Sequence, residues 1–154
     1  MCFLTGVRSE QRREVPGAEP AAYRTSMGVK LGLVGTVTLM VADADTSLAL
    51  HSGDVPVLGT PRVVALAEEA TVEAVADHLP ANTTTVGYQV QLTHLAPTPV
   101  GGRVSAEATL ESIEGRRLTF RVSVSDGRGL VAAGRVTRVV VERTRFLERA
   151  LGDG

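Results

Sequence analysis

One glutamate interrupts the apolar face of a predicted helix. In GTPRVVALAEEATVEAV, residues 59–75, Glu68 lies four residues after Val64 and four before Val72, and side chains at this spacing share a helix face. The adjacent Glu69 lies on the charged, solvated face. An unpaired carboxylate is costly on an apolar face, so it needs a nearby donor. An acid in this position is a candidate general base or nucleophile.

A histidine on a predicted strand supplies such a donor. Alternation in TTTVGYQVQLTHL places five side chains on one face: Val86, Tyr88, Val90, Leu92 and His94. We expect this face to lie against the helix, so that His94 and Glu68 converge. Titratable groups that face one another are a signal of a functional site. Taken singly, His94 also fits a hydrogen-bonded core histidine, and Glu68 fits the margin of the apolar stripe, where it reaches water.

A threonine and a glycine add two further candidates. Thr60 is predicted to be the N-cap of the helix, ahead of Pro61, beside free backbone N–H groups and the positive end of the helix dipole. Gly87 is predicted on the strand face opposite His94, and a glycine there indicates either a β-bulge or the close approach of a ligand or backbone. A plain N-cap and a plain bulge are simpler explanations, but one shared site accounts for all four residues together.

The remaining elements follow from periodicity. We predict a strand over 35–41, a loop over 48–59 and a helix that continues to about Leu79, before Pro80. Four strands joined by short turns follow, and RTRFLERAL is predicted to form a short terminal helix. Short links imply antiparallel neighbours, and strands with one apolar face imply a sheet covered on one side. The predicted fold class is α+β, with a curved antiparallel sheet wrapped around one long central helix.

Composition limits the functions that this chain can have. Its 154 residues predict one domain, with residues 1–26 as a disordered tail and 27–154 as the folded domain. A net charge of −1 and the absence of tryptophan argue against nucleic acid or an anionic membrane as a partner. The single cysteine, Cys2, excludes an internal disulfide and favours the cytoplasm. No Cys/His spacing predicts a metal site.

Together these segments resemble a known family. One helix wrapped by an antiparallel sheet is similar to the hot-dog fold, and TPRVVALAEE, VGYQVQLTHLAPTPVG and VSAEATLESIEGRRLTFRVSVSDG resemble the fluoroacetyl-CoA thioesterase family. That family has a Thr at the helix start, a Glu eight residues later, a His on the following strand and a Gly seven residues before the His. The matching positions are Thr60, Glu68, His94 and Gly87.

The resemblance implies hydrolysis of an acyl thioester such as an acyl-CoA. Glu68 would be the base or nucleophile, His94 would orient the acid or water or protonate the thiolate, Thr60 would position these groups, and Gly87 would pack against the acyl group. The resemblance implies no cofactor, because coenzyme A would arrive as part of the substrate. It also implies that the protein is a homodimer. Four arginines are candidates for its phosphates, although solvation explains most of them: Arg103, Arg116, Arg117 and Arg121.

One segment departs from the family pattern. The family's phenylalanines before the Thr are absent, and this chain has LHSGDVPVLG there, which argues against fluoroacetyl specificity and favours a general or differently specialised thioesterase. Three alternatives remain: a non-catalytic acyl-CoA-binding dimeric module, a hydratase or dehydratase of related fold, and a structural dimerisation module.

Overall fold

The computed structural model describes residues 28–152, so the predicted tail over 1–26 lies outside the described residues. The elements follow the predicted order of strand, loop, helix and four strands: β1 (Val34–Met40), a short 3-10 turn η1 (Asp43–Asp45), α2 (Thr60–Val75), β2 (Thr83–His94), β3 (Arg103–Glu114), β4 (Arg117–Asp126), β5 (Gly129–Glu142) and the terminal helix α3 (Arg143–Leu151). No helix in the described part of the chain is long and apolar enough to cross a membrane.

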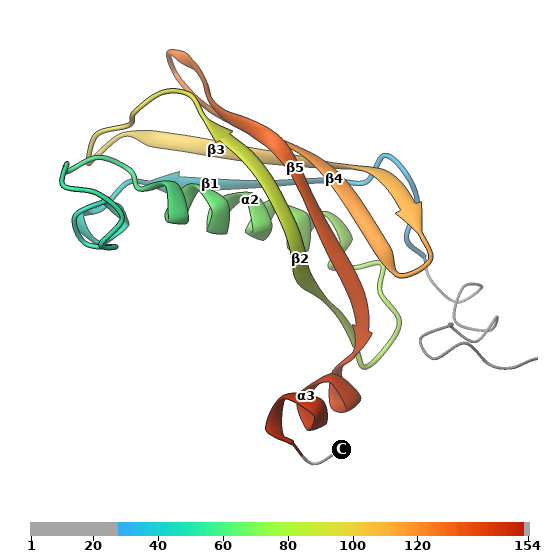
Figure 1. Cartoon of the computed structure of the whole chain (residues 1–154). Coiled ribbons are helices and arrows are strands. Elements are labelled where there is room, and N and C mark those ends of the chain that lie inside the picture. Colours follow the sequence, from blue (N-terminus) through green and yellow to red (C-terminus); the bar gives the residue numbers. More distant parts are fainter. Residues whose placement is uncertain (1–27, 153–154) are drawn as a thin grey trace, which may run out of the picture.

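The five strands form one antiparallel sheet in the order β1-β3-β4-β5-β2. The sheet curves around α2, which lies along its concave side beneath β1 and β3, while β5 and β2 cross the helix obliquely (Figure 1). This is the predicted α+β architecture. It leaves β2 at one edge of the sheet, on the open side of α2.

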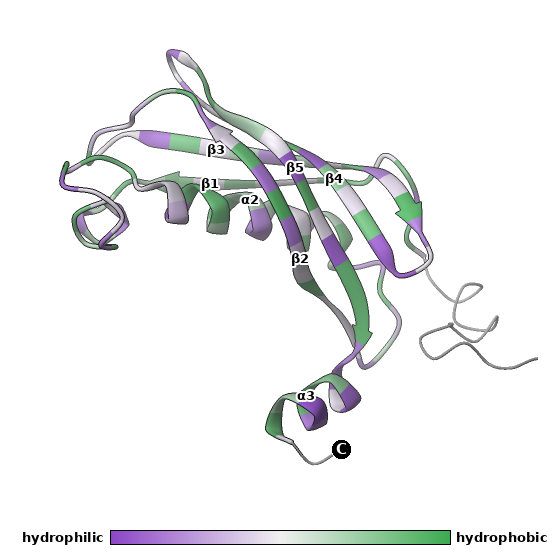
Figure 2. Cartoon of the chain, viewed as in Figure 1, coloured by the Kyte–Doolittle hydropathy of each residue, from purple (hydrophilic) through white to green (hydrophobic). Residues whose placement is uncertain are grey.

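Alternating residues build the core between the helix and the sheet. Hydrophilic and hydrophobic positions alternate along the strands (Figure 2), and the inward residues of β3 and β4 are fully buried: Val104, Ala106, Ala108, Leu110, Leu118, Phe120, Val122 and Val124. Helix α2 buries Leu66, Ala67 and Ala70 against them. A Cβ on Gly35 of β1 would lie 2.2 Å from the carbonyl oxygen of Ala70. Glycine therefore lets strand and helix backbones approach, which fixes where α2 sits.

Both predicted ends of the helix were wrong. The N-cap is Gly59, whose N–H donates to the Asp45 carbonyl (2.9 Å), and Thr60 is the first helical residue. The helix ends at Val75, four residues before the predicted end. There the His78 N–H donates to the Val75 carbonyl (3.0 Å), so a tight turn closes the helix before Pro80 is reached.

Strand β2 contains a β-bulge that the predicted alternation missed. Gly87 pairs with Arg138 and Gln89 pairs with Thr137 on β5, so Tyr88 is the extra residue. A bulge residue breaks the period of two, and the two halves of the strand present different sets of residues to the helix.

The bulge corrects the predicted inner face of β2. Beyond it, Leu92 and His94 are half-buried on the helix side, as predicted. Before it, the buried residue is Thr85, and the side chain of Tyr88 is 57% exposed. Gly87, which was predicted on the opposite face, is turned toward the helix.

Candidate active site

The first cluster of the site lies at the N-terminus of α2. The Thr60 Oγ1 atom lies 2.9 Å from Nδ1 of His94, which ends β2. Gly59 caps the helix, so the threonine hydroxyl is available to the histidine. Either atom can be the donor, depending on the tautomer of the imidazole. The contact fixes the orientation of the ring.

The other ring nitrogen of His94 is buried and has no hydrogen-bond partner among residues 28–152. Most buried polar atoms in proteins are satisfied, so an unpaired one needs an explanation. A hydrogen bond on Nδ1 selects the state of Nε2. The pair therefore presents an oriented nitrogen that can accept a proton from a bound group or donate one to it.

The second cluster surrounds Glu68, midway along α2. Oε2 of Glu68 accepts a hydrogen bond from Nη1 of Arg138 at 2.8 Å. The side chain of Glu68 is 34% exposed and that of Arg138 is 7% exposed. Glu68 therefore lies at the margin of the buried stripe, with its charge balanced by a guanidinium that the sheet encloses.

Gly87 lies directly over this carboxylate. A Cβ at position 87 would be 2.5 Å from Oε2 of Glu68 and 3.8 Å from Nη1 of Arg138. No side chain fits there without displacing the acid. The β-bulge explanation for this glycine holds, and the group that approaches it closely is the Glu68 side chain rather than another backbone.

The predicted pairing of Glu68 with His94 was wrong within one chain. His94 contacts Thr60, and Glu68 contacts Arg138. Thr60 and Glu68 are eight residues apart, and at 1.5 Å per residue the helix separates them by about 12 Å. The structure thus brings the four predicted residues into two pairs along the open side of α2.

The partner of Glu68 is the residue that sequence reasoning missed. In GRVTRVVVE, Arg138 alternates with the buried Val136 and Val140 and therefore occupies an inward position. That pattern was a usable signal, since an arginine on a buried face requires an acid or carbonyl partner. Burial lowers the pKa of Arg138, and the charge of Glu68 and its hydrogen bond oppose this shift.

The loop before Thr60 carries aliphatic rather than aromatic side chains. Thr46 and Leu58 form a bridge that closes its base, and the side chain of Leu50 would lie 3.1 Å from a Cβ on Gly59, next to Thr60. Three aliphatic side chains of this loop are exposed: Leu48, Leu50 and Val55. The start of α2 is therefore bordered by the aliphatic side chain of Leu50.

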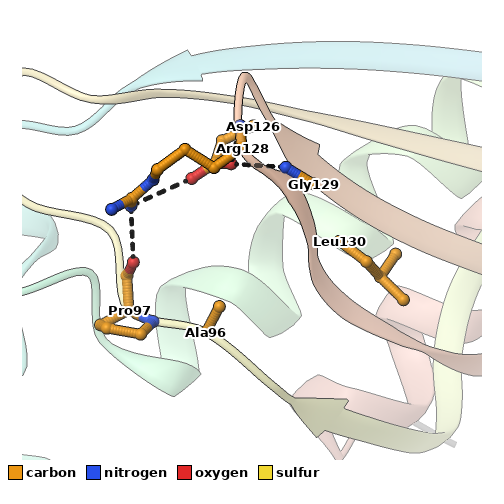
Figure 3. Close-up of a pocket in the computed structure, with 6 residues that line it drawn as sticks. All are labelled: Ala96, Pro97, Asp126, Arg128, Gly129 and Leu130. Atoms are coloured by element: carbon orange, nitrogen blue, oxygen red, sulfur yellow. Dashed lines mark hydrogen bonds and ion pairs between the residues drawn. The ribbon is translucent and has the colours of Figure 1, made fainter.

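A separate hollow of about 240 Å³ lies beyond the end of β2 (Figure 3). Arg128 donates to the Pro97 carbonyl (3.1 Å) and pairs with Asp126 (3.3 Å). The backbone N–H of Arg128 is the main cause of a lowered pKa of Asp126. These contacts tie the β4–β5 turn to the segment after β2, and none of the four predicted site residues lines this hollow.

The arginines considered for phosphate binding are all exposed. Arg117 lies over the Tyr88 ring, 4.6 Å from its centroid, and donates to the Tyr88 hydroxyl at 3.1 Å. Arg121 borders a hollow on the polar outer face of the sheet. The phosphate role stays a prediction for each of them.

Comparison with known proteins places this geometry in a family. Residues 41–144 match the model of the fluoroacetyl-CoA-specific thioesterase family. The fluoroacetyl-CoA thioesterase of Streptantibioticus cattleyicolor is 39% identical over 90 residues, which are 58% of this chain and 65% of that enzyme, just under two thirds of its length.

Solved structures agree with this match. A structure of the fluoroacetyl-CoA thioesterase has 31% identity and a TM-score of 0.77 over 82% of this chain and 98% of its own. A thioesterase superfamily member from Thermus thermophilus has 26% identity and a TM-score of 0.73 over 80% and 93%. A family match over more than half of the chain, on a shared fold, shows that this protein belongs to the fluoroacetyl-CoA-specific thioesterase family.

Proposed function

We propose that this protein hydrolyses an acyl-CoA thioester to a carboxylic acid and a free thiol. The observation that carries the proposal is the hydrogen bond between Thr60 and His94, whose buried Nε2 has no partner in the part of the chain that the structure describes. Family membership supports the same chemistry. Related structures of the fluoroacetyl-CoA thioesterase hold fluoroacetate and CoA, or acetyl-CoA.

In the proposed reaction the C–S bond of the thioester is replaced by a C–O bond from water. Glu68 takes the proton of the attacking water, or attacks the carbonyl itself to give an acyl anhydride that water then cleaves. His94, oriented by Thr60, protonates the departing thiolate or holds the water. The Gly87 backbone packs against the acyl group beside the carboxylate.

The spacing of the two clusters supports a homodimer. Within one chain about 12 Å of helix separates Thr60 from Glu68, too far for both to act on one carbonyl. Strand β2 pairs on one edge only among the described residues, and Val72, which shares a helix face with Glu68 four residues earlier, is 45% exposed. We propose that two chains associate along β2 and α2, so that Thr60 and His94 of one chain meet the partner's Glu68.

The absence of phenylalanine in the loop before Thr60 argues against fluoroacetyl as the preferred acyl group. The exposed Leu48, Leu50 and Val55 of the loop before Thr60 suit an aliphatic acyl chain. The single cysteine supports a cytoplasmic location.

A hydrolysis screen tests the activity directly. Short, branched, aromatic and long acyl-CoAs are incubated with the protein and with Glu68→Gln, and the released thiol is measured. The expected result is turnover of at least one acyl-CoA by the wild type, its loss in Glu68→Gln, and acyl-CoA binding by both proteins in calorimetry. Binding without turnover by the wild type would instead identify a non-catalytic acyl-CoA-binding module.

A further inference from the structure

Arg138 is a buried charge that has no part in the proposed reaction as described so far. Arg138 is the only buried charged residue among residues 28–152, and 6% of its surface is exposed. It lies on β5, directly across from Gly87 of β2. A guanidinium stays charged at neutral pH even when it is enclosed, so its position requires partners.

Thr85 and Glu68 are those partners. Nε of Arg138 donates to the Thr85 hydroxyl at 2.8 Å, and Nη2 donates to the Thr85 carbonyl at 2.9 Å. Two parallel contacts to one residue hold the plane of the guanidinium. The third contact, from Nη1, reaches Oε2 of Glu68 at 2.8 Å. Thr85 thus holds the arginine, and the arginine holds the acid.

The bulge makes this arrangement possible. Because Tyr88 is the extra residue, Thr85 and Gly87 face the helix in the same strand as His94. Gly87 leaves room above the carboxylate, and Thr85 supplies a hydroxyl and a carbonyl beside the arginine. The other carboxylate oxygen, Oε1, has no hydrogen-bond partner in the described part of the chain.

We infer that Arg138, held by Thr85, is a positioning residue that fixes Oε2 of Glu68 and leaves Oε1 to attack the thioester or to activate water. The inference rests on the proposed thioester hydrolysis. It assigns a division of labour within one carboxylate: one oxygen is anchored and the other reacts. A misplacement of about 1 Å at such a group costs about 10²-fold in rate.

The test compares variants of the anchor with a matched control. Arg138→Met removes the donors while keeping much of the side-chain volume, and Arg138→Lys keeps the charge but cannot make the forked contact. Thr85→Val removes the hydroxyl that holds the arginine, and Thr85→Ser retains it. Arg135→Met is the control, because Arg135 lies on the same strand, pairs with Glu111 at 2.6 Å and is exposed.

The readouts are kcat, KM and the thermal midpoint of each full-length variant, measured with the acyl-CoA that the wild type hydrolyses best. We expect kcat to fall about 10²-fold in Arg138→Met and about tenfold in Arg138→Lys and Thr85→Val, with KM within about twofold. Thr85→Ser and Arg135→Met should keep wild-type kcat. Added guanidinium at millimolar concentration should restore part of the activity of Arg138→Ala, whereas Glu68→Gln should not respond.

The outcomes separate two failures. If the wild type hydrolyses acyl-CoA and folded Arg138→Met keeps its kcat, the inference is overturned and the proposed function stands. A change in thermal midpoint alone, with unchanged kcat and no guanidinium rescue, means that the arginine is only structural, which also overturns the inference. If the wild type hydrolyses no acyl-CoA, the proposed function fails and the inference fails with it. If Arg138→Met does not fold, Thr85→Val and Arg138→Lys decide in its place.

Discussion

The two clusters along α2 are built in opposite ways. At the start of the helix, the His94 ring makes one hydrogen bond among residues 28–152, to Thr60, and its buried Nε2 has no partner in that range. Midway along the helix, Glu68 meets a guanidinium that Thr85 holds by two further contacts. The histidine is oriented from one side only, whereas the glutamate is fixed by a buried network.

The difference fits two chemical tasks. A group that passes protons to a leaving thiolate needs a ring nitrogen that no protein group occupies, and one contact is enough to orient its ring. A carboxylate that attacks or activates water must keep a fixed place, and rigid neighbours supply it. The two clusters therefore need different experiments.

The largest effect is expected from mixing two inactive variants. His94→Ala and Glu68→Gln are co-expressed, or exchanged as subunits, in equal amounts. If each active site combines His94 of one chain with the partner's Glu68, half of the dimers hold one intact site, and activity recovers to about a quarter of wild type. Thiol release per milligram measures this. No recovery in verified mixed dimers would mean that both clusters act within one chain.

The role of the unpaired Nε2 of His94 is tested by replacing the histidine with alanine, asparagine or glutamine. We expect His94→Ala to lower kcat about 10²–10⁴-fold. His94→Asn keeps a polar atom near Thr60 but none at the Nε2 position, so it should be as impaired as alanine. His94→Gln, whose amide reaches further, should recover part of the rate. Equal activity of His94→Asn and wild type would show that Nε2 is not used.

Alanine substitutions at Gly87 and Gly35 are expected to have different effects, the first on activity and the second on stability. In Gly87→Ala the new Cβ would lie 2.5 Å from the tip of the Glu68 side chain, which can move, so we expect kcat to fall about 10²-fold with little change in Tm. In Gly35→Ala the Cβ would meet the Ala70 backbone at 2.2 Å, which cannot move, so that variant should lose stability. The check is kcat and Tm of both. A large Tm loss in Gly87→Ala would contradict the contrast.

A smaller effect is expected at the threonine. Thr60→Val removes one hydrogen bond to His94, worth about 1 kcal/mol, so we expect kcat to fall roughly tenfold or less. Thr60→Ser keeps the hydroxyl and should stay close to wild type. Helix content by circular dichroism should not change, because Gly59 is the cap. A large loss of helix content in Thr60→Val would show that Thr60 stabilises the N-terminus of α2 and not only His94.

The smallest effect is expected at Glu142, which lies outside both clusters and serves as a control for them. Glu142 caps α3 by accepting from the backbone N–H of Arg145 (2.9 Å) and Thr144 (3.2 Å), and the first of these bonds is the main reason that its pKa lies below the usual 4.5. A lowered folded-state pKa adds stability above the unfolded pKa, and this stability is lost as pH falls below about 4.5 through the folded pKa.

We therefore expect Glu142→Gln to unfold at a slightly lower Tm than wild type at pH 7, with the two curves converging at acidic pH. Its kcat should be unchanged, because α3 lies far from α2 at the end of β5 (Figure 1). Scanning calorimetry over a pH series measures the convergence. A difference in Tm that persists in acid would mean that the cap acts through packing and not through charge.

The fold could be predicted from the sequence because its signals are local. Alternation along the strands, short turns and one amphipathic helix specify a curved sheet around α2, and these were confirmed. The helix ends were wrong, because the loop before Thr60 and the tight turn at His78 are set by contacts that no local pattern records.

The site could be predicted only in part. Residue types and spacing identified Thr60, Glu68, Gly87 and His94 as unusual, and the structure places all four on the open side of α2. Their pairing could not be predicted, because alternation assumes a regular strand and the bulge at Tyr88 breaks it. Arg138 was visible as an arginine between buried valines, but its partner depends on the register of β2 against β5. The catalytic roles stay predictions.

The bulge in β2 predicts how this strand can vary in length among related proteins. Without Tyr88, β2 would alternate without interruption, and Thr85, Gly87 and His94 would still face the helix. A deletion in this strand that left the bulge in place would turn one of the two clusters outward. Related sequences that are one residue shorter in this strand should therefore lack the bulge. The aromatic side chain there, held by Arg117 on the outer face, would be the part of the strand that evolution is free to remove.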